Sequence, residues 1–338
     1  MPDLPARLTI PSAWKGAELA TVPEEWSSTL SDQEIEELSA AVTKFVVKNG
    51  DLARITAKSF PLPTLDLKLN GIRQALLHGV GFSVVRGLPA DGLADDEITA
   101  MFAGIGAHIG SHRPQNAAGD LIGHVRNTGA DSGNPHTRIY ETCERQTFHT
   151  DSADVVGLLC LRQAREGGES LVVSAATIYN EILAQRPDLL PYLFEGIATD
   201  RRGETPPGAR PFFTIPVFSW YAGFLTVMYQ RQYIDSAQRF DDVPRLTPEH
   251  IDALDLFDKL ANDSRLHIKM KLRRGDMQFV HNHSLLHDRT AFIDRPEPER
   301  KRHMLRLWLA VPGDRPLPDC FVERYGSIEI GNRGGVGL

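Results

Sequence analysis

The first third of the chain carries apolar residues at helical spacing. After Ser31, which forms a capping box with Glu34, they recur every three or four positions up to Gly50, a pattern typical of an amphipathic helix. Similar patterns predict helices over 65–78 and 95–109, with a short strand over 82–87 between them. Residues 1–29 are rich in Pro and Trp. Because Trp14 and Trp26 would be costly to leave in water, we expect an ordered arm packed on the core.

From about residue 121 the pattern changes to short apolar runs that predict β-strands. These runs cover 123–126, 155–161, 169–173, 211–217, 225–229, 266–272, 277–280 and 304–309, and helical patterns interrupt them near 175–184, 187–194 and 248–261. Helices followed by many strands at irregular spacing favour an α+β chain with a β-sandwich or barrel core.

No repeat, low-complexity tract or linker divides the sequence, so we expect a single domain over residues 1–338. Its parts are an N-terminal arm (1–29), helical decoration (30–120), a β-core with the functional site (121–310) and a Gly-rich tail (325–338). A Gly-rich terminus predicts partial mobility for the tail.

Composition mainly excludes classes of partner. The formal net charge is -7 and no basic stripe is evident, which argues against nucleic acid or a membrane surface as partner. No apolar run reaches the roughly 18 residues of a membrane span, and the N-terminus lacks the regions of a signal peptide. The three cysteines are widely spaced and form no disulfide framework or zinc pattern, so we expect a reducing cytoplasm, with Cys160 as a small core residue.

Candidate chemistry begins at Phe148-His149-Thr150-Asp151. Residues two apart on an extended segment point to the same side, so His149 and Asp151 can bind one metal ion. The alternative is a His and an Asp with ordinary hydrogen bonds at a strand end. A later segment, 275–292, holds three further histidines at 281, 283 and 287, and spacing alone does not choose among them. A ligand from this segment would make a site from two distant strands, which suits a rigid β-scaffold.

Four segments, taken together and in this order, resemble the taurine dioxygenase/TfdA-like family of Fe(II)- and 2-oxoglutarate-dependent oxygenases. They are FHTD (148–151), GGES (167–170), LHDRTAF (286–292) and RHMLRLWL (302–309). The resemblance implies a double-stranded β-helix, or jelly roll, with helices packed outside. It also implies a dioxygenase that uses O2 and 2-oxoglutarate, hydroxylates a C–H bond of a small organic substrate and releases succinate and CO2.

The same resemblance assigns site residues. His149, Asp151 and His287 stand at the Fe(II) ligand positions, and such a triad leaves three coordination positions open for a bidentate co-substrate and oxygen. Arg302 stands where the distal carboxylate of 2-oxoglutarate is bound, a role that suits the guanidinium fork. Ser170 replaces a Thr whose hydroxyl often contacts that carboxylate. Related halogenases lack the carboxylate ligand, so Asp151 argues against halogenation.

Arg306 follows Arg302 by four residues and would face the same side of a strand. In relatives that oxidise anionic substrates, the equivalent Arg can hold the acidic group, which suggests an anionic substrate, most simply a carboxylate. The alternative for Arg306 is a salt bridge with an acid such as Asp288. We interpret Arg289 as a member of a structural ion pair.

Further residues are candidates for the substrate pocket, although packing or loop roles are open for each. They are Arg126, Asn127, Tyr140 and Gln146, together with Tyr229, Gln230 and Tyr233. The turn-rich segment 130–147 predicts a lid that orders on binding.

Two rival functions share these residues. A zinc hydrolase could use the same three ligands and a metal-bound water, but it would have no use for an Arg dedicated to a second carboxylate. A jelly-roll ligand-binding protein with a vestigial site would bind its ligand without metal. The sequence leaves open the substrate, the choice between hydroxylation and desaturation, cyclisation or cleavage, and whether the chain forms a homo-oligomer.

Overall fold

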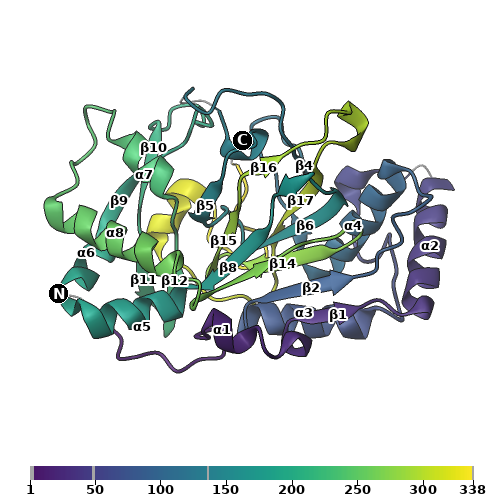
Figure 1. Ribbon diagram of the computed structural model, residues 1–338, viewed down its shortest axis with the longest axis horizontal. Helices are drawn as coiled ribbons and strands as arrows, with labels where there is room; N and C mark the ends of the chain where they lie inside the picture. Colours follow the sequence, from purple (N-terminus) through teal and green to yellow (C-terminus); the bar gives the residue numbers. More distant parts are fainter. Residues whose placement is uncertain (1–3, 48–49, 135–136, 337–338) are drawn as a thin grey trace.

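Two β-sheets form the centre of the computed structural model, which describes residues 4–47, 50–134 and 137–336 (Figure 1). The larger sheet has the order β1 (Ser27–Thr29), β2 (Phe82–Arg86), β14 (Met277–His281), β6 (Val155–Arg162), β17 (His303–Ala310) and β3 (Ser111–His112), and β4 (Ile122–Val125) also pairs with β17. The smaller has the order β13 (His267–Met270), β8 (Ser170–Ser174), β15 (Leu285–Arg289) and β5 (Gln146–His149). This α+β arrangement confirms the predicted jelly-roll class.

Alternation along the strands divides side chains between separate cores. The three leucines of β17 pack with helices α2 (Asp32–Val47), α3 (Asp66–His78) and α4 (Asp95–Ile109), on the outer face of the larger sheet. Met304 and Trp308 instead join residues of both sheets in a core between them. Because side chains two apart on a strand share a face, Arg306 is placed on the inner side with these two residues.

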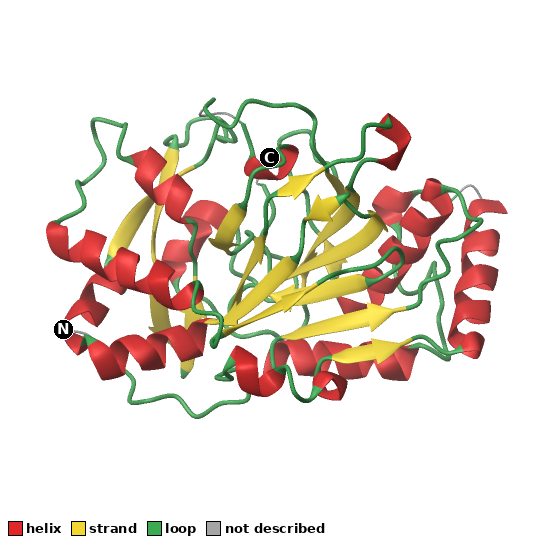
Figure 2. Cartoon of the chain, in the orientation of Figure 1, coloured by secondary structure: helices red, strands yellow, loops and turns green. Residues whose placement is uncertain are grey.

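A second group of helices covers the outer face of the smaller sheet, at the left of Figure 2. It comprises α5 (Ala175–Gln185), α6 (Leu190–Leu193), α7 (Arg231–Ala237) and α8 (Pro248–Ala261). Two hairpins accompany it, β9 (Gly196–Asp200) with β10 (Phe212–Pro216) and β11 (Phe218–Tyr221) with β12 (Phe224–Val227). The remaining short elements are α1 (Gly16–Leu19), α9 (Val322–Tyr325) and the pair β7 (Glu166–Gly167) and β16 (Phe292–Ile293). No helix in the described parts of the chain is both long and apolar enough to cross a membrane.

The N-terminal segment is fastened to the core by its tryptophans, as the sequence predicts. Trp14 and Trp26 are each 8% exposed and lie 5.7 and 5.4 Å from the ring of Phe82. The predicted capping box of α2 is also present, since the main-chain N–H of Ser31 donates to the Glu34 carboxylate at 2.7 Å. Residues 30–120 supply more than helical decoration, because β2 lies inside the larger sheet between β1 and β14.

The described end of the Gly-rich tail, residues 333–336, is packed on the core, whereas residues 326–332 are exposed or half-buried, and the partial mobility of the tail stays a prediction. Arg333 is fully buried, and its guanidinium donates to Asp154 at 2.6 Å and to Asp314 at 3.0 Å. A Cβ on Gly334 or Gly335 would lie 2.8 Å from a main-chain oxygen of a neighbouring segment. These glycines therefore permit close packing of the tail instead of loosening it. Residues 337–338 lie outside the described residues.

Candidate active site

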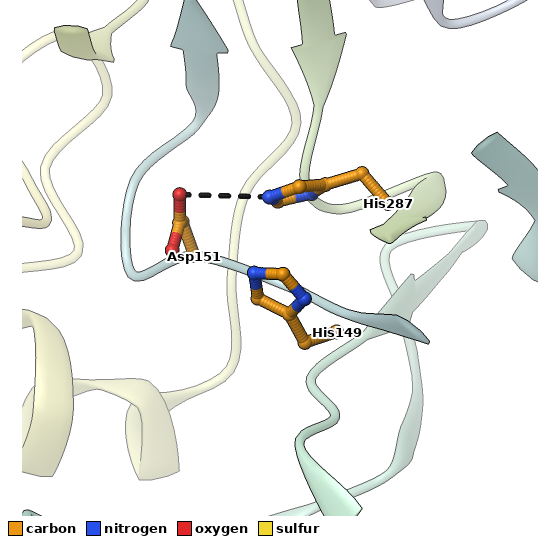
Figure 3. Close-up of side chains that lie close together, drawn as sticks. All are labelled: His149, Asp151 and His287. Atoms are coloured by element: carbon orange, nitrogen blue, oxygen red, sulfur yellow. Dashed lines mark ion pairs between the residues drawn. The ribbon is translucent and has the colours of Figure 1, made fainter. Parts of the chain in front are cut away.

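Two neighbouring strands of the smaller sheet bring His149 and His287 together. His149 ends β5 and lies directly opposite His287 of β15, and Asp151 follows two residues later in the loop before β6. The candidate ligand atoms of the three residues all lie within 4.8 Å of one another, and His287 Nε2 is 3.7 Å from Asp151 Oδ2. Figure 3 shows the carboxylate and both imidazoles converging on one point. All three side chains are buried.

Hydrogen bonds orient two of these side chains, His149 and Asp151, for metal binding. His149 Nδ1 donates to the carbonyl of Thr147 at 2.8 Å, so the lone pair of this imidazole is at Nε2. That Nε2 accepts from the amide of Gln146 at 2.9 Å, and a metal would take the place of this donor. Trp308 Nε1 donates to Asp151 Oδ2 at 2.9 Å. Two neutral imidazole nitrogens and one carboxylate fit Fe(II), although Nδ1 of His287 has no hydrogen-bond partner among the described residues.

Burial and charge set protonation states that favour a divalent metal. Burial alone would raise the pKa of Asp151, but Arg306 and the two histidines hold that pKa well below its ordinary value. Burial is the main cause that lowers the pKa of His287 to about 3, and it lowers the pKa of His149 as well. At neutral pH the site therefore offers a charged carboxylate and two neutral imidazoles, as metal ligation requires.

Two cavities border the triad. We call the first the strand cavity; the space around it, including the part that is open to solvent, is about 680 Å³. Strands of both sheets line it, and its polar lining includes Gln146, His149, Ser170, His287, Arg289 and Arg302. The structure thus brings the predicted Ser170 and Arg302 to the same cavity as the two histidines. Ser170 Oγ donates to Gln278 Oε1 at 2.6 Å, and Cys160, predicted as a core residue, also borders the cavity.

Two buried guanidinium groups face the strand cavity without a carboxylate partner. Arg302 Nη1 and Arg289 Nε and Nη1 have no hydrogen-bond partner among the described residues. Both guanidinium groups lie against Phe292, with carbons 5.0 and 4.8 Å from its ring centre. Burial lowers the pKa of Arg302 to about 10, and burial together with Arg302 lowers that of Arg289 to about 9. Both groups remain cationic at neutral pH, so the cavity is prepared for an anion.

The interpretation of Arg289 as an ion-pair member is wrong. Its neighbour Asp288 pairs instead with Arg145 at 2.6 Å, and Arg289 makes no ion pair within the described chain. A signal was available in the sequence, because Arg289 lies two residues after His287 on one strand and therefore shares its face. Gly168 forms a turn and also leaves room for Arg302, because a Cβ at position 168 would lie 2.9 Å from Arg302 Nε.

The second cavity, which we call the loop cavity, is lined by the loop after β5, the β9–β10 hairpin, α7 and α9. The space around it, including the part that is open to solvent, is about 480 Å³. Four arginines reach it, at positions 138, 201, 306 and 324, and Gln230 and Tyr233 line it as the sequence suggested. Asp151 belongs to its wall. Sequence reasoning missed Arg138, Arg201 and Arg324, which occur in segments without a motif.

Arg306 lies at the boundary between the two cavities. Its Nε donates to Gln115 Oε1 at 2.7 Å, and its Nη1 lies 3.6 Å from Asp151 Oδ1. Tyr140 and Trp308 flank the guanidinium, 4.7 and 4.8 Å from their ring centres. Asp288, the alternative ion-pair partner of Arg306, pairs with Arg145 instead. Of the remaining candidates, Gln146 also lines both cavities, and Tyr140 lines the strand cavity.

Other candidates lie away from the triad. Arg126 is exposed, and Asn127 accepts a hydrogen bond from the Gly129 main chain at 2.9 Å. Neither is among the described residues that line the two cavities. His281 and His283 are buried in the network that fastens the tail, at 3.0 Å from Asp314 and 2.9 Å from Asp154 respectively. Of the three later histidines, His287 is the one at the triad.

Comparison with known proteins agrees with this geometry. The family model of the taurine catabolism dioxygenase TauD, TfdA family matches residues 48–308. The chain is 32% identical to FR-33289 synthase of Streptomyces rubellomurinus over 93% of this chain and 94% of that protein. It is 30% identical to the taurine hydroxylase-like protein SAT17 of Stachybotrys chartarum over 90% and 80% of the two chains.

Solved structures share the fold. The non-heme iron oxygenase OrfP, in complex with Fe and alpha-ketoglutaric acid, superimposes with a TM-score of 0.63 at 15% identity, over 84% of this chain and 93% of that one. The chain therefore belongs to the TauD/TfdA family and is a non-haem Fe(II)- and 2-oxoglutarate-dependent dioxygenase.

Proposed function

We propose that His149, Asp151 and His287 hold Fe(II), that the strand cavity binds 2-oxoglutarate, and that the loop cavity receives a small anionic substrate whose C–H bond is hydroxylated. The observation that carries this proposal is the position of one metal triad between two arginine-lined cavities. A dioxygenase of this family needs such a pair of sites, because co-substrate and substrate must both reach the metal.

Arg302 and Ser170 bind the distal carboxylate of 2-oxoglutarate in this proposal. Arg302 has an unpaired buried N–H, and a guanidinium fork can make two parallel charge-assisted hydrogen bonds to a carboxylate. Arg289 adds a second cation on the same ring of Phe292. When bound, Fe(II) and 2-oxoglutarate supply the oxidation of the C–H bond by O2, with release of succinate and CO2.

The protein's own contribution is positioning. Arg306 and Gln146 border both cavities, so they hold the substrate's reacting end next to the triad and separate it from the co-substrate. The carboxylate of Asp151 occupies the position that halogenases leave free, which favours hydroxylation over halogenation. Arg138 lines the loop cavity and Tyr140 the strand cavity, which supports the described parts of segment 130–147 as a lid over the site; residues 135–136 lie outside the described residues.

The cellular setting that we propose is the cytoplasm. All three cysteines are free, and Cys143 is exposed. Free thiols suit a reducing compartment.

An anaerobic titration of the Fe(II)-loaded protein with 2-oxoglutarate tests the proposal. We expect the weak visible charge-transfer band of the iron chelate in the wild type. The His149→Ala variant should lack it, because one of three metal ligands is removed. A folded, iron-loaded wild-type protein without the band would contradict the proposal. A screen of small anionic acids for stimulated succinate release would then test the substrate class.

A further inference from the structure

The loop cavity carries more positive charge than its walls balance. Most of its charged groups have an opposite partner. These pairs are Arg138 with Glu204 and Arg239 with Asp200, while Arg306 is held at the boundary of the cavity by Gln115 and by Asp151, the proposed metal ligand. Since each pair is close to neutral, the charge that decides the cavity's ligand comes from the arginines that remain.

Arg201 and Arg324 are those arginines, and neither forms an ion pair among the described residues. Arg201 is 5% exposed and donates only to carbonyl groups, from Nε to Arg210 at 3.1 Å and from Nη2 to Glu323 at 2.5 Å. Arg324 is 9% exposed and donates from Nε to the hydroxyl of Ser152 at 2.7 Å. Within the described chain, Nε is the one guanidinium atom of Arg324 for which a hydrogen bond is present.

The two cations are neighbours, and they lie close to the metal triad. Each guanidinium carbon is 5.5 Å from the ring centre of Phe213. Ser152, which holds Arg324, directly follows the ligand Asp151 in the chain. The amide Nε2 of Gln230 is buried in the same wall and has no hydrogen-bond partner among the described residues. The wall thus offers two unbalanced positive charges and a free neutral donor.

Buried charges without partners are unfavourable until a ligand balances them. A carboxylate or a sulfonate brings one negative charge. A phosphate monoester brings about −1.5 to −2 at pH 7 and three acceptor oxygens. A phosphonate has the same three oxygens but loses its second proton at a higher pH, so only part of it is a dianion at pH 7. We propose that the loop cavity binds the doubly charged phosphorus oxyacid head of the substrate, a phosphonate or a phosphate monoester, through Arg201 and Arg324.

The assignment of this anion site to the substrate rests on the proposed function. With the head at Arg324 and Ser152, the carbon chain extends toward the triad, and the length of that chain selects the C–H bond that reacts. The assignment replaces the simple carboxylate that the sequence suggested.

The test is an anaerobic calorimetric titration of the full-length protein loaded with Fe(II) and 2-oxoglutarate. The probes are propylphosphonate, propyl phosphate, propanesulfonate and butyrate, which differ mainly in the acidic head. We expect at least one phosphorus acid to bind tenfold or more tightly than the sulfonate and the carboxylate. Comparison of the two phosphorus acids distinguishes a phosphonate from a phosphate ester. Equal or tighter sulfonate binding, or no binding of any probe, would overturn the proposal.

Variants locate the binding. Arg324→Gln and Arg201→Gln should each weaken binding of the preferred phosphorus acid at least tenfold, with 2-oxoglutarate affinity changed less than threefold. The control is Arg186→Gln, an equal charge change at an exposed residue paired with Asp188, and it should change neither. Unchanged phosphorus-acid binding in both folded cavity variants would contradict the proposal.

A pH series of binding titrations on the wild-type protein tests the proposal without depending on the folding of a variant. The affinity of propyl phosphate should fall as the pH drops below its second ionisation, near pH 6, while that of propanesulfonate should stay constant. Parallel profiles would overturn the requirement for a dianion. Absence of the iron chelate band with 2-oxoglutarate would count against the proposed function instead. Titration of propyl phosphate into the same protein would still test the anion site by itself.

Discussion

The two cavities differ in how the chain builds them. The strand cavity is lined by residues of regular strands of the two sheets, which hold Ser170, His287 and Arg289 at fixed positions. The loop cavity is lined largely by a loop, a hairpin and short helices, and one of its arginines comes from α9 near the end of the chain. In the proposed function, the regular strands therefore hold the co-substrate, and the loop, the hairpin and the short helices hold the substrate. Rigid elements hold such sites more accurately than loops do.

The largest effect that we expect comes from the attachment of the tail. Arg333→Ala leaves the buried carboxylates of Asp154 and Asp314 without their arginine, which should lower the free energy of unfolding by about 3–5 kcal/mol. Because this contact also fastens the region of α9, phosphorus-acid binding should suffer more than 2-oxoglutarate binding. Denaturant unfolding and the two titrations measure these changes. Equal losses in both cavities would mean that they are not independent.

Removal of Arg302 tests the other side of the comparison. Arg302→Ala should weaken 2-oxoglutarate binding by about 2–5 kcal/mol, as expected when one partner of a buried charge pair is lost. Binding of the phosphorus acid should persist, because Arg302 does not line the loop cavity within the described chain. The chelate band measures the co-substrate and calorimetry the acid. An unchanged 2-oxoglutarate affinity would remove Arg302 from the site.

Replacement of Arg289 should change 2-oxoglutarate affinity and the stability of the ligand-free protein in opposite directions. Arg289→Gln should weaken 2-oxoglutarate binding by about 1.5–3 kcal/mol, the usual contribution of a hydrogen bond to a charged group. The same change should raise the melting temperature of the ligand-free protein, because it removes a buried cation without a carboxylate partner. Thermal unfolding with and without 2-oxoglutarate checks both effects. A variant that is less stable without ligand would point to a structural role instead.

Gly168 gives the smallest expected effect. Gly168→Ala adds strain of about 1–2 kcal/mol at φ +71° and pushes Arg302 Nε from a Cβ only 2.9 Å away. The matched control is Gly313→Ala, at φ +82° with nothing within 4 Å of the new Cβ. Both variants should lose similar stability, but 2-oxoglutarate affinity should fall in Gly168→Ala alone. The same affinity in the two variants would show that Arg302 adjusts freely.

The sequence by itself determined the features that depend on local spacing. Asp151 follows His149 by two residues at the end of β5, and Arg306, within β17, follows by four residues Arg302, which directly precedes that strand. A shared orientation within each pair is what the alternation of β-structure predicts. The Ser31 capping box and the bounds of α4 were equally local. The four matching segments identified the family because they occur in the chain in the order that is typical of that family.

Only the tertiary structure decided what lies opposite these residues. It chose His287 over His281 and His283, left Arg126 outside both cavities, and brought Arg201 and Arg324 together from positions far apart in the chain. It also showed that the end of the Gly-rich tail, residues 333–336, is packed, since Gly334 and Gly335 make room for neighbouring main chain. Local periodicity fixes which side chains share one face of one element. The surfaces that meet across distant segments, and the charges that remain unbalanced between them, are fixed by packing of the whole chain.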